Sequence, residues 1–197
     1  MSPVFQAPHS PLDETGKHQA QRVATRVARL SFDTLLSSPF SRAKETAEAI
    51  AKATGKEPEY SDLFVERLKP TSIDGKLFSD PEAAALWRAW NESLYVSGAR
   101  VLDGENFDDL LVRADRALAF LTARPEQSLV VVTHGYFLRT LVARVLLGDA
   151  LSGDTFQRVQ RMASTENTGL TVLRYQGAFE EEPWWRLWTY NDHAHLQ

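Results

Sequence analysis

The chain has 197 residues, of which 43% are hydrophobic and 24% charged, as is ordinary for one globular α/β domain with a full core. Its net charge of −4 argues against a general electrostatic affinity for nucleic acid or for an anionic membrane. It contains no cysteine, which excludes disulfides, cysteine-ligated zinc and a thiol nucleophile. No apolar run approaches the ~18 residues of a membrane span, and we expect a cytoplasmic protein.

The spacing of apolar residues predicts helices and strands along the whole chain. Apolar residues at helical spacing indicate the helices, and short apolar runs between turn residues indicate the strands. Ser37-Ser38-Pro39 is expected to start a helix, with serine as the N-cap and proline in the first turn. In chain order we expect helices over 13–30 and 40–54 with a strand over 32–36 between them, a strand over 59–65, helices over 80–97 and 105–123, a strand over 129–132, a helix over 136–147, a polar connection over 151–162 that can include a helical turn, and strands over 167–175 and 184–190.

The most informative stretch is 129–147, in which a strand passes directly into a helix. Leu129 to Val132 are four consecutive apolar residues, a pattern typical of a strand buried on both faces in the middle of a parallel sheet. His134 lies at the junction, and Gly135 allows close approach of backbone or ligand. Anionic ligands bind at such junctions, beside the free N–H groups of a helix, so His134 is a candidate ligand-binding residue. The alternative is a histidine that only packs at the end of a core strand.

Arg42 occupies a similar position, in the first turn of the helix expected over 40–54. A cation gains nothing from the helix dipole there, because this end of a helix favours negative charge. A structural salt bridge could account for Arg42, but an anionic ligand shared with the helix N-terminus explains it better. Glu66 follows the strand expected over 59–65.

These elements predict an α/β fold, a three-layer sandwich with a mostly parallel central sheet flanked by helices on both faces. We expect a single domain over residues 1–197, in which 67–104 forms an insertion over the ligand-binding edge of the sheet. Each tryptophan of this insertion is expected to pack in the core rather than to contact a substrate. His193 and His195 lie near the end of the chain and are expected to be exposed to solvent rather than to bind a metal.

With these segments placed, the sequence resembles the histidine phosphatase superfamily, the branch that includes cofactor-dependent phosphoglycerate mutases and their phosphatase relatives. The resemblance rests on SPLDETGKHQAQRVA, LLSSPFSRAKETAEAIA, GENFDDLLVRADRAL, VVVTHGYFLRTLV and ENTGLTVLRY. It implies that Arg42, His134 and Gly135 bind phosphate, that His134 is also the second catalytic histidine, and that Glu66 protonates the leaving oxygen. It also implies a small phosphorylated substrate or phosphate as the ligand, and neither a metal nor another cofactor.

One part of the family pattern is missing. Members of the family have a central strand ending in Arg-His-Gly, which carries the nucleophilic histidine and precedes the motif found here as SPLDETG, but these 197 residues contain no Arg-His-Gly. His9, in a proline-bounded loop, and His18, on the outer part of a helix, are not expected to replace that histidine. Whether the chain as written is an enzyme therefore stays open.

Two interpretations of this departure compete. The chain is either an N-terminally truncated phosphomonoester hydrolase of the phosphohistidine type, inactive as written, or a family member that has lost catalysis and keeps a phospholigand-binding or interaction role. Loss of a central strand would expose the edges of its neighbours, so we favour the first. A purely structural interpretation would require Arg42, Glu66 and His134 to be scattered in the fold.

Overall fold

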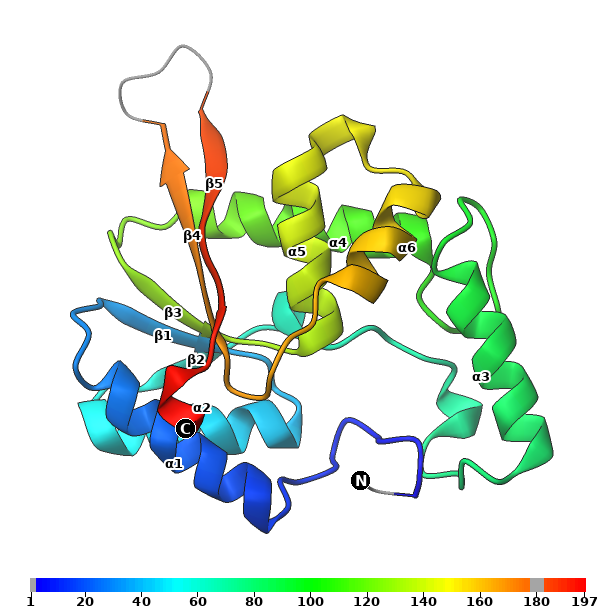
Figure 1. Cartoon of the computed structure of the whole chain (residues 1–197), viewed down its shortest axis with the longest axis horizontal. Coiled ribbons are helices and arrows are strands. Elements are labelled where there is room, and N and C mark those ends of the chain that lie inside the picture. Colours follow the sequence, from blue (N-terminus) through cyan, green and yellow to red (C-terminus); the bar gives the residue numbers. More distant parts are fainter. Residues whose placement is uncertain (1–2, 178–182) are drawn as a thin grey trace.

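The computed structural model describes residues 3–177 and 183–197. Figure 1 shows its helices and strands. In chain order they are α1 (Glu14–Val27), β1 (Thr34–Ser37), α2 (Ser41–Thr54), β2 (Pro58–Tyr60), α3 (Pro81–Ser93), α4 (Phe107–Thr122), β3 (Leu129–Val132), α5 (Gly135–Leu147), α6 (Gly153–Met162), β4 (Leu170–Gln176) and β5 (Trp184–Asp192). Among the described residues, no helix is both long enough and apolar enough to cross a membrane.

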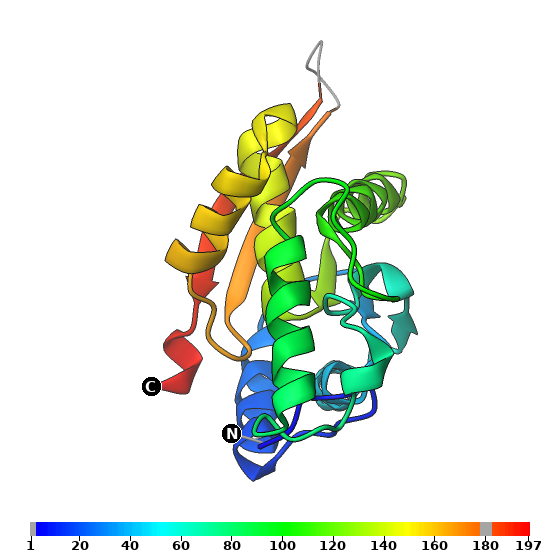
Figure 2. The same ribbon diagram turned by 90° about the vertical axis from the view of Figure 1, so that its right-hand side faces the viewer.

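Strands β2, β1 and β3 form a parallel sheet with β1 in the middle. Helices α1 and α2 cover one face of this sheet, and α4 and α5 cover the other (Figures 1 and 2). Ser37 pairs with both Tyr60 and Val132, so the three strands end level with one another. The three-layer α/β fold is therefore confirmed, as is the parallel pairing of the strands expected near 32–36 and 129–132.

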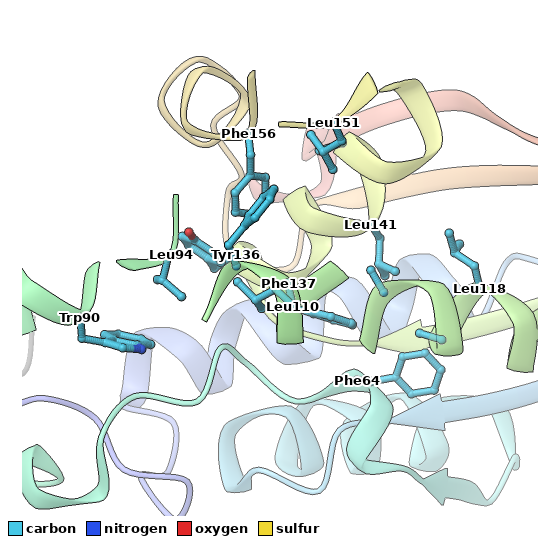
Figure 3. Packing of buried hydrophobic residues seen from close by; sticks show 14 of the residues in the cluster. Phe64, Trp90, Leu94, Leu110, Leu118, Tyr136, Phe137, Leu141, Leu151 and Phe156 are labelled. Atoms are coloured by element: carbon cyan, nitrogen blue, oxygen red, sulfur yellow. The ribbon is translucent and has the colours of Figure 1, made fainter. Parts of the chain in front are cut away.

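Alternate residues of the strands supply two apolar clusters, one on each face of the sheet. In β1, Leu35 packs with α1 and α2, whereas Leu36 packs with α4 and α5. The cluster beneath α1 and α2 contains Val23, Ala24, Val27, Phe32, Leu35, Ala47 and Ile50. The larger cluster, drawn in Figure 3, includes Phe64, Trp90, Leu110, Leu118, Phe137, Leu141 and Phe156. The helices thus bury the apolar faces that their residue spacing predicts.

Strand β3 differs from its prediction. Val131 packs on the larger cluster and Val130 and Val132 pack on the smaller one, so both faces of β3 contact apolar side chains as expected. All four residues of β3 nevertheless stay partly exposed, because within the described residues β3 pairs with β1 alone. The prediction of a strand buried in the middle of the sheet is therefore wrong for this structure, in which β3 is an edge strand.

The last two strands, β4 and β5, form a separate antiparallel ribbon. The ribbon stands beside the sheet and projects beyond it (Figure 1), and Trp185 of β5 packs on the larger cluster. Leu170, at the start of β4, packs on the same cluster as Val130 and Val132 of β3. Strands β3 and β4 thus reach one apolar cluster without pairing, and the expected single sheet is divided in two.

Local side-chain hydrogen bonds explain where most helices begin. The Asp13 carboxylate caps α1 by accepting the N–H of Gly16 at 2.8 Å, and Asp80 caps α3 in the same way. Gly55 ends α2 in the left-handed conformation with φ of 72°. Helix α2 begins later than predicted: its N-cap is Phe40, so Pro39 precedes the helix instead of occupying its first turn.

Two further segments differ from their predictions. The connection expected over 151–162 is the helix α6, which begins at a reciprocal capping box between Ser152 and Thr155. The strand expected over 59–65 is shorter, because Ser61 accepts the N–H of Leu63 and starts a 3₁₀ turn over Asp62–Phe64. This early turn redirects the chain toward Glu66.

The segment over 67–104, predicted to be an insertion, packs through aromatic side chains. Trp90 is fully buried, and its indole N–H donates to the backbone carbonyl of Glu105 at 2.8 Å. The Phe5 ring lies 5.0 Å from that of Trp87, so the first described residues pack against α3. The predicted core role is confirmed for Trp90, whereas Trp87 is half-buried at the margin of the core.

The prediction of exposed C-terminal histidines is wrong. His195 is partly buried against α1, with Nδ1 3.2 Å from Nη1 of Arg26 and Nε2 3.0 Å from Oγ1 of Thr168. The cause is tertiary, because a short 3₁₀ turn after β5 folds the last residues onto α1 (Figure 1). Burial in this contact lowers the pKa of His195.

Candidate functional site

Arg42, Glu66 and His134 lie on three neighbouring connections at the carboxyl edge of the parallel sheet. Arg42 is in the first turn of α2 after β1, Glu66 follows the turn after β2, and His134 follows β3. Because the three strands end level, these connections leave the sheet at the same edge. Ligands of open α/β sheets bind outside this edge. Arg42, Glu66 and His134, the candidate residues predicted from the sequence, therefore lie at one edge of the sheet and are not scattered in the fold.

His134 is the N-cap residue of α5 and is buried. Its Nε2 lies 2.8 Å from the hydroxyl oxygen of Ser38, a buried residue that follows β1. The same oxygen accepts the backbone N–H of Phe40 at 3.2 Å, so the hydroxyl hydrogen is free to be donated to Nε2. This arrangement favours a neutral imidazole that carries its proton on Nδ1.

The electrostatic surroundings also favour neutral His134. Burial lowers the pKa of His134 to about 4. The carboxylate of Glu66 opposes this effect, whereas the positive charges of Arg42 and Arg113 also lower the pKa. At neutral pH the imidazole is thus uncharged before any ligand binds. An anion beside it would favour protonation, so His134 can respond to a phosphoryl group by gaining a proton.

Replacing Ser38 with alanine tests this hydrogen bond. We expect the pKa of His134 to be higher in Ser38→Ala than in the wild type, because a bond donated to Nε2 stabilises the neutral ring. The pKa is measured by ¹⁵N NMR of the histidine ring nitrogens between about pH 3 and pH 8. Ser37→Ala is the matched control, since its buried hydroxyl donates to the Ser38 carbonyl instead. Equal His134 titration in Ser38→Ala and the wild type would contradict the assignment.

Arg42 has a buried guanidinium nitrogen without a partner. Its Nη1 is inaccessible to solvent and forms no hydrogen bond within the described part of the chain. The guanidinium lies 5.5 Å from the centroid of the Phe40 ring, which lies 5.3 Å from the imidazole of His134. Burial lowers the pKa of Arg42, and the charge of Glu66 opposes this effect. A buried unpaired donor is costly, so Arg42 is suited to binding an anion.

The Glu66 carboxylate is bound by free N–H groups at the start of α5. It accepts the N–H of Phe137 at 3.1 Å, that of Tyr136 at 3.4 Å and that of Arg67 at 3.0 Å. Burial tends to raise the pKa of Glu66, but His134, Arg67 and Arg42 beside it and the hydrogen bond donated by the Arg67 N–H outweigh burial, and the pKa lies below its ordinary value. Glu66 is therefore ionised in the free protein at neutral pH. An anion on Arg42 would reduce that stabilisation and favour the protonated acid.

Gly135 lies close to the side chain of Thr165. A Cβ atom at this position would lie 2.9 Å from the hydroxyl oxygen of Thr165, too near for an ordinary contact. Thr165 in turn accepts a hydrogen bond from Nη1 of Arg139 at 2.8 Å. A side chain at position 135 would therefore require Thr165 to move, and a role for Gly135 in phosphate binding stays a prediction.

The sequence did not identify several residues around the site. Ser38 lies within the SSPF segment, whose position before a helix was its only local signal. Arg67 stacks on Tyr136, with its guanidinium 4.0 Å from the ring centroid, and its Nη1 donates to Asn91 at 2.7 Å. No pattern marks Arg67, because its partners come from other segments. His9 and His18 are exposed, as expected.

Comparison with known proteins agrees with the fold and with the motifs. Residues 4–189 match the histidine phosphatase superfamily (branch 1). The chain belongs to this superfamily. A probable phosphoglycerate mutase GpmB from Photorhabdus laumondii is 33% identical over 198 residues, which cover 95% of this chain and 84% of that protein. The protein of the same name from Escherichia coli is 30% identical over 192 residues, with the same coverage.

Solved structures of similar fold extend over nearly the whole chain. YhfR of Bacillus stearothermophilus superposes with a TM-score of 0.76 at 24% identity, covering 99% of this chain and 92% of its own. A mycobacterial glucosyl-3-phosphoglycerate phosphatase superposes with a TM-score of 0.74 at 24% identity, and the match covers 97% of this chain and 93% of the phosphatase chain. That phosphatase has been solved with inorganic phosphate and with VO₃. These superpositions confirm the fold.

Proposed function

We propose that this chain provides the phosphoryl-binding site of a phosphomonoester hydrolase of the phosphohistidine type, which acts in the cytoplasm on a small phosphorylated metabolite. The observation that carries the proposal is the buried, unpaired guanidinium nitrogen of Arg42 beside neutral His134. Relatives named for phosphoglycerate, glucosyl-3-phosphoglycerate and α-ribazole phosphate support the substrate class.

Each residue has a role in this proposal. Phosphoryl transfer needs mainly positioning and stabilisation of charge on the transferring oxygens. Arg42 supplies a planar fork of N–H donors, and His134 supplies an imidazole that takes up a proton as negative charge approaches. Glu66 takes up a proton once an anion occupies Arg42 and then donates it to the leaving oxygen. The backbone N–H of Gly135 would face the bound anion.

The nucleophile is proposed to lie on a strand outside these 197 residues. Within residues 3–177 and 183–197, β3 is an apolar edge strand and β4 pairs with β5 alone, beside the same apolar cluster. Natural proteins protect such edges, and an added strand between β3 and β4 would pair both. A strand ending in Arg-His-Gly would bring a second arginine and the nucleophilic histidine to the carboxyl edge. We therefore propose that the 197 residues alone bind phosphate without turnover.

A non-catalytic phospholigand-binding or interaction domain is the second candidate. It is favoured because no described histidine other than His134 is placed at the site: His9 and His18 are exposed, His195 contacts Arg26 of α1, and His193 bonds to the Asn191 carbonyl. Its weakness is the unpaired apolar edge of β3, which is hazardous in a stable evolved domain. The two candidates differ in whether an added Arg-His-Gly strand confers turnover.

We further propose that the insertion over 67–104 walls the ligand site. Arg67, next to Glu66, stacks on Trp87 and Trp90 at 5.0 and 4.9 Å and so ties the insertion to the acid. We propose hydrolase rather than mutase activity, because a mutase must retain its phosphorylated intermediate through additional basic contacts, and these are not evident in this sequence.

Binding of orthovanadate to the 197-residue chain tests the site. At a concentration one hundred times its Kd, a ligand of the folded state stabilises a protein by about 2.7 kcal/mol, so a clear rise in Tm is expected. Arg42→Ala should remove most of this rise, because it deletes the buried cation. Arg29→Ala is the matched control, since Arg29 is an exposed arginine at the end of α1. No rise in the wild type, or an equal rise in Arg42→Ala, would refute the site.

A further inference from the structure

Arg113 of α4 and Glu105, just before α4, form a buried ion pair. Nε of Arg113 lies 2.7 Å from Oε1 of Glu105, and Nη2 lies 2.8 Å from Oε2, so the two planar groups meet as parallel forks. The two side chains are only 12% and 6% exposed. The phosphoryl-transfer roles proposed above use neither residue, so the pair requires another explanation.

The remaining hydrogen bonds of this pair go to the backbone around Glu66. Nη1 of Arg113 donates to the carbonyl of Val65 at 2.8 Å, and Nη2 donates to that of Glu66 at 3.4 Å. On the other side, Oε2 of Glu105 accepts the N–H of Leu68 at 3.1 Å, and the Glu105 N–H donates to the Leu68 carbonyl at 2.7 Å. The pair thus holds the chain before, at and after Glu66.

Arg113 also contacts the helix turn that binds the Glu66 carboxylate. Its guanidinium lies 3.9 Å from the centroid of the Phe137 ring. The backbone N–H of Phe137 donates to Oε1 of Glu66 at 3.1 Å. One side chain therefore contacts both the backbone that carries the acid and the residue whose N–H binds its carboxylate.

We propose that the Glu105–Arg113 pair is a positioning element that directs the Glu66 carboxylate toward the start of α5. The proposal rests on the proposed function, in which Glu66 is the acid. A purely stabilising role explains less, because a buried ion pair is often no more stabilising than apolar side chains of similar volume. Apolar replacements could fill the space, but they could not bind three backbone groups of the Val65–Leu68 segment.

Arg113→Lys tests this role, because lysine keeps the charge but loses the planar fork. We expect the pKa of Glu66 to rise toward the ordinary value of glutamate, since the carboxylate loses its alignment with the N–H groups of α5. The pKa is followed by ¹³C NMR of the side-chain carboxyl, assigned with Glu66→Gln. The other titratable groups that face Glu66, which are the cations Arg42 and Arg67 and the imidazole of His134, stay in place.

Arg144→Lys is the matched control. Nε of Arg144 on α5 lies 2.6 Å from Asp115 on α4, so this pair joins α4 and α5, the two helices that Arg113 also links through Phe137. The other partners of Arg144 are Asp149 and the Gly148 carbonyl. A changed Glu66 pKa in Arg113→Lys alone supports the proposal. Equal losses of Tm in both variants with an unchanged Glu66 pKa overturn it.

A second variant and a separate measurement keep the test decisive. If Arg113→Lys does not fold, the double variant Glu105→Gln/Arg113→Gln provides the comparison, because it removes both charges of the pair together with its planar fork. Orthovanadate protection of the wild type is measured independently. Its absence would refute the proposed phosphoryl site, while the Glu66 titration would still report whether the pair orients this carboxylate.

Discussion

Fusing a strand that ends in Arg-His-Gly to the start of this chain should turn a protein with background phosphatase activity into an active one. The expected gain is large, because removing the nucleophile from a catalytic set can cost roughly 10⁶ in rate. Among the described residues, Arg42 and His134 supply only part of the phosphoryl cradle and Glu66 supplies the acid, but no group is placed to attack phosphorus. Hydrolysis of p-nitrophenyl phosphate by the chain and by the fusion measures the effect.

A fusion whose strand ends in Arg-Asn-Gly is the matched control. Both fusions should raise Tm, because the added strand pairs the free edges of β3 and β4 and covers the partly exposed residues of β3. Only the histidine version should hydrolyse the substrate. If both fusions are stable and neither has activity, the non-catalytic candidate function is favoured.

Two results with the unfused chain would contradict the assignment of roles. Robust turnover that is abolished by His9→Ala would mean that the exposed loop histidine is the nucleophile. Turnover that survives His9→Ala but is lost in His134→Ala would require a different mechanism, because His134 is proposed to stabilise the transferring group and not to attack it.

Trp90→Ala should destabilise the chain by about 3–5 kcal/mol, the usual range for truncating a buried aromatic side chain to alanine. Trp90 is fully buried, and its indole N–H satisfies the Glu105 carbonyl, which would lose its partner. The stacking of Arg67 on its ring would also be lost. The change is measured as the free energy of unfolding in urea.

Trp188→Ala is the control for this prediction. The Trp188 side chain is 57% exposed on the β4–β5 ribbon, so the same substitution there should change stability by no more than about 0.5 kcal/mol. Equal destabilisation by the two substitutions would contradict the assignment of Trp90 to the core. Strong destabilisation by Trp90→Ala together with weaker orthovanadate protection would link the insertion to the ligand site.

Local signals in the sequence were sufficient for most of the elements and for the candidate residues. The apolar run over 129–132 and the glycine at 55 predict a strand and a helix end without knowledge of any partner. Arg42 and His134 could be named because each stands at a junction between strand and helix, which is a property of a short stretch of chain. Level strand ends in a parallel sheet then bring such junctions together.

Tertiary structure alone decided which groups are paired. Ser38 meets His134 and Arg113 meets Val65 across long separations in sequence, so no local pattern reveals either contact. The apolar run of β3 has the composition of a central strand, yet β3 lies at an edge of the sheet. Composition did not predict this, because it indicates how many faces of a strand contact apolar groups and not how many of its edges are hydrogen-bonded. Whether a neighbouring strand is present depends on pairing between distant segments, and that is why the sequence predicted one sheet where the folded chain has two.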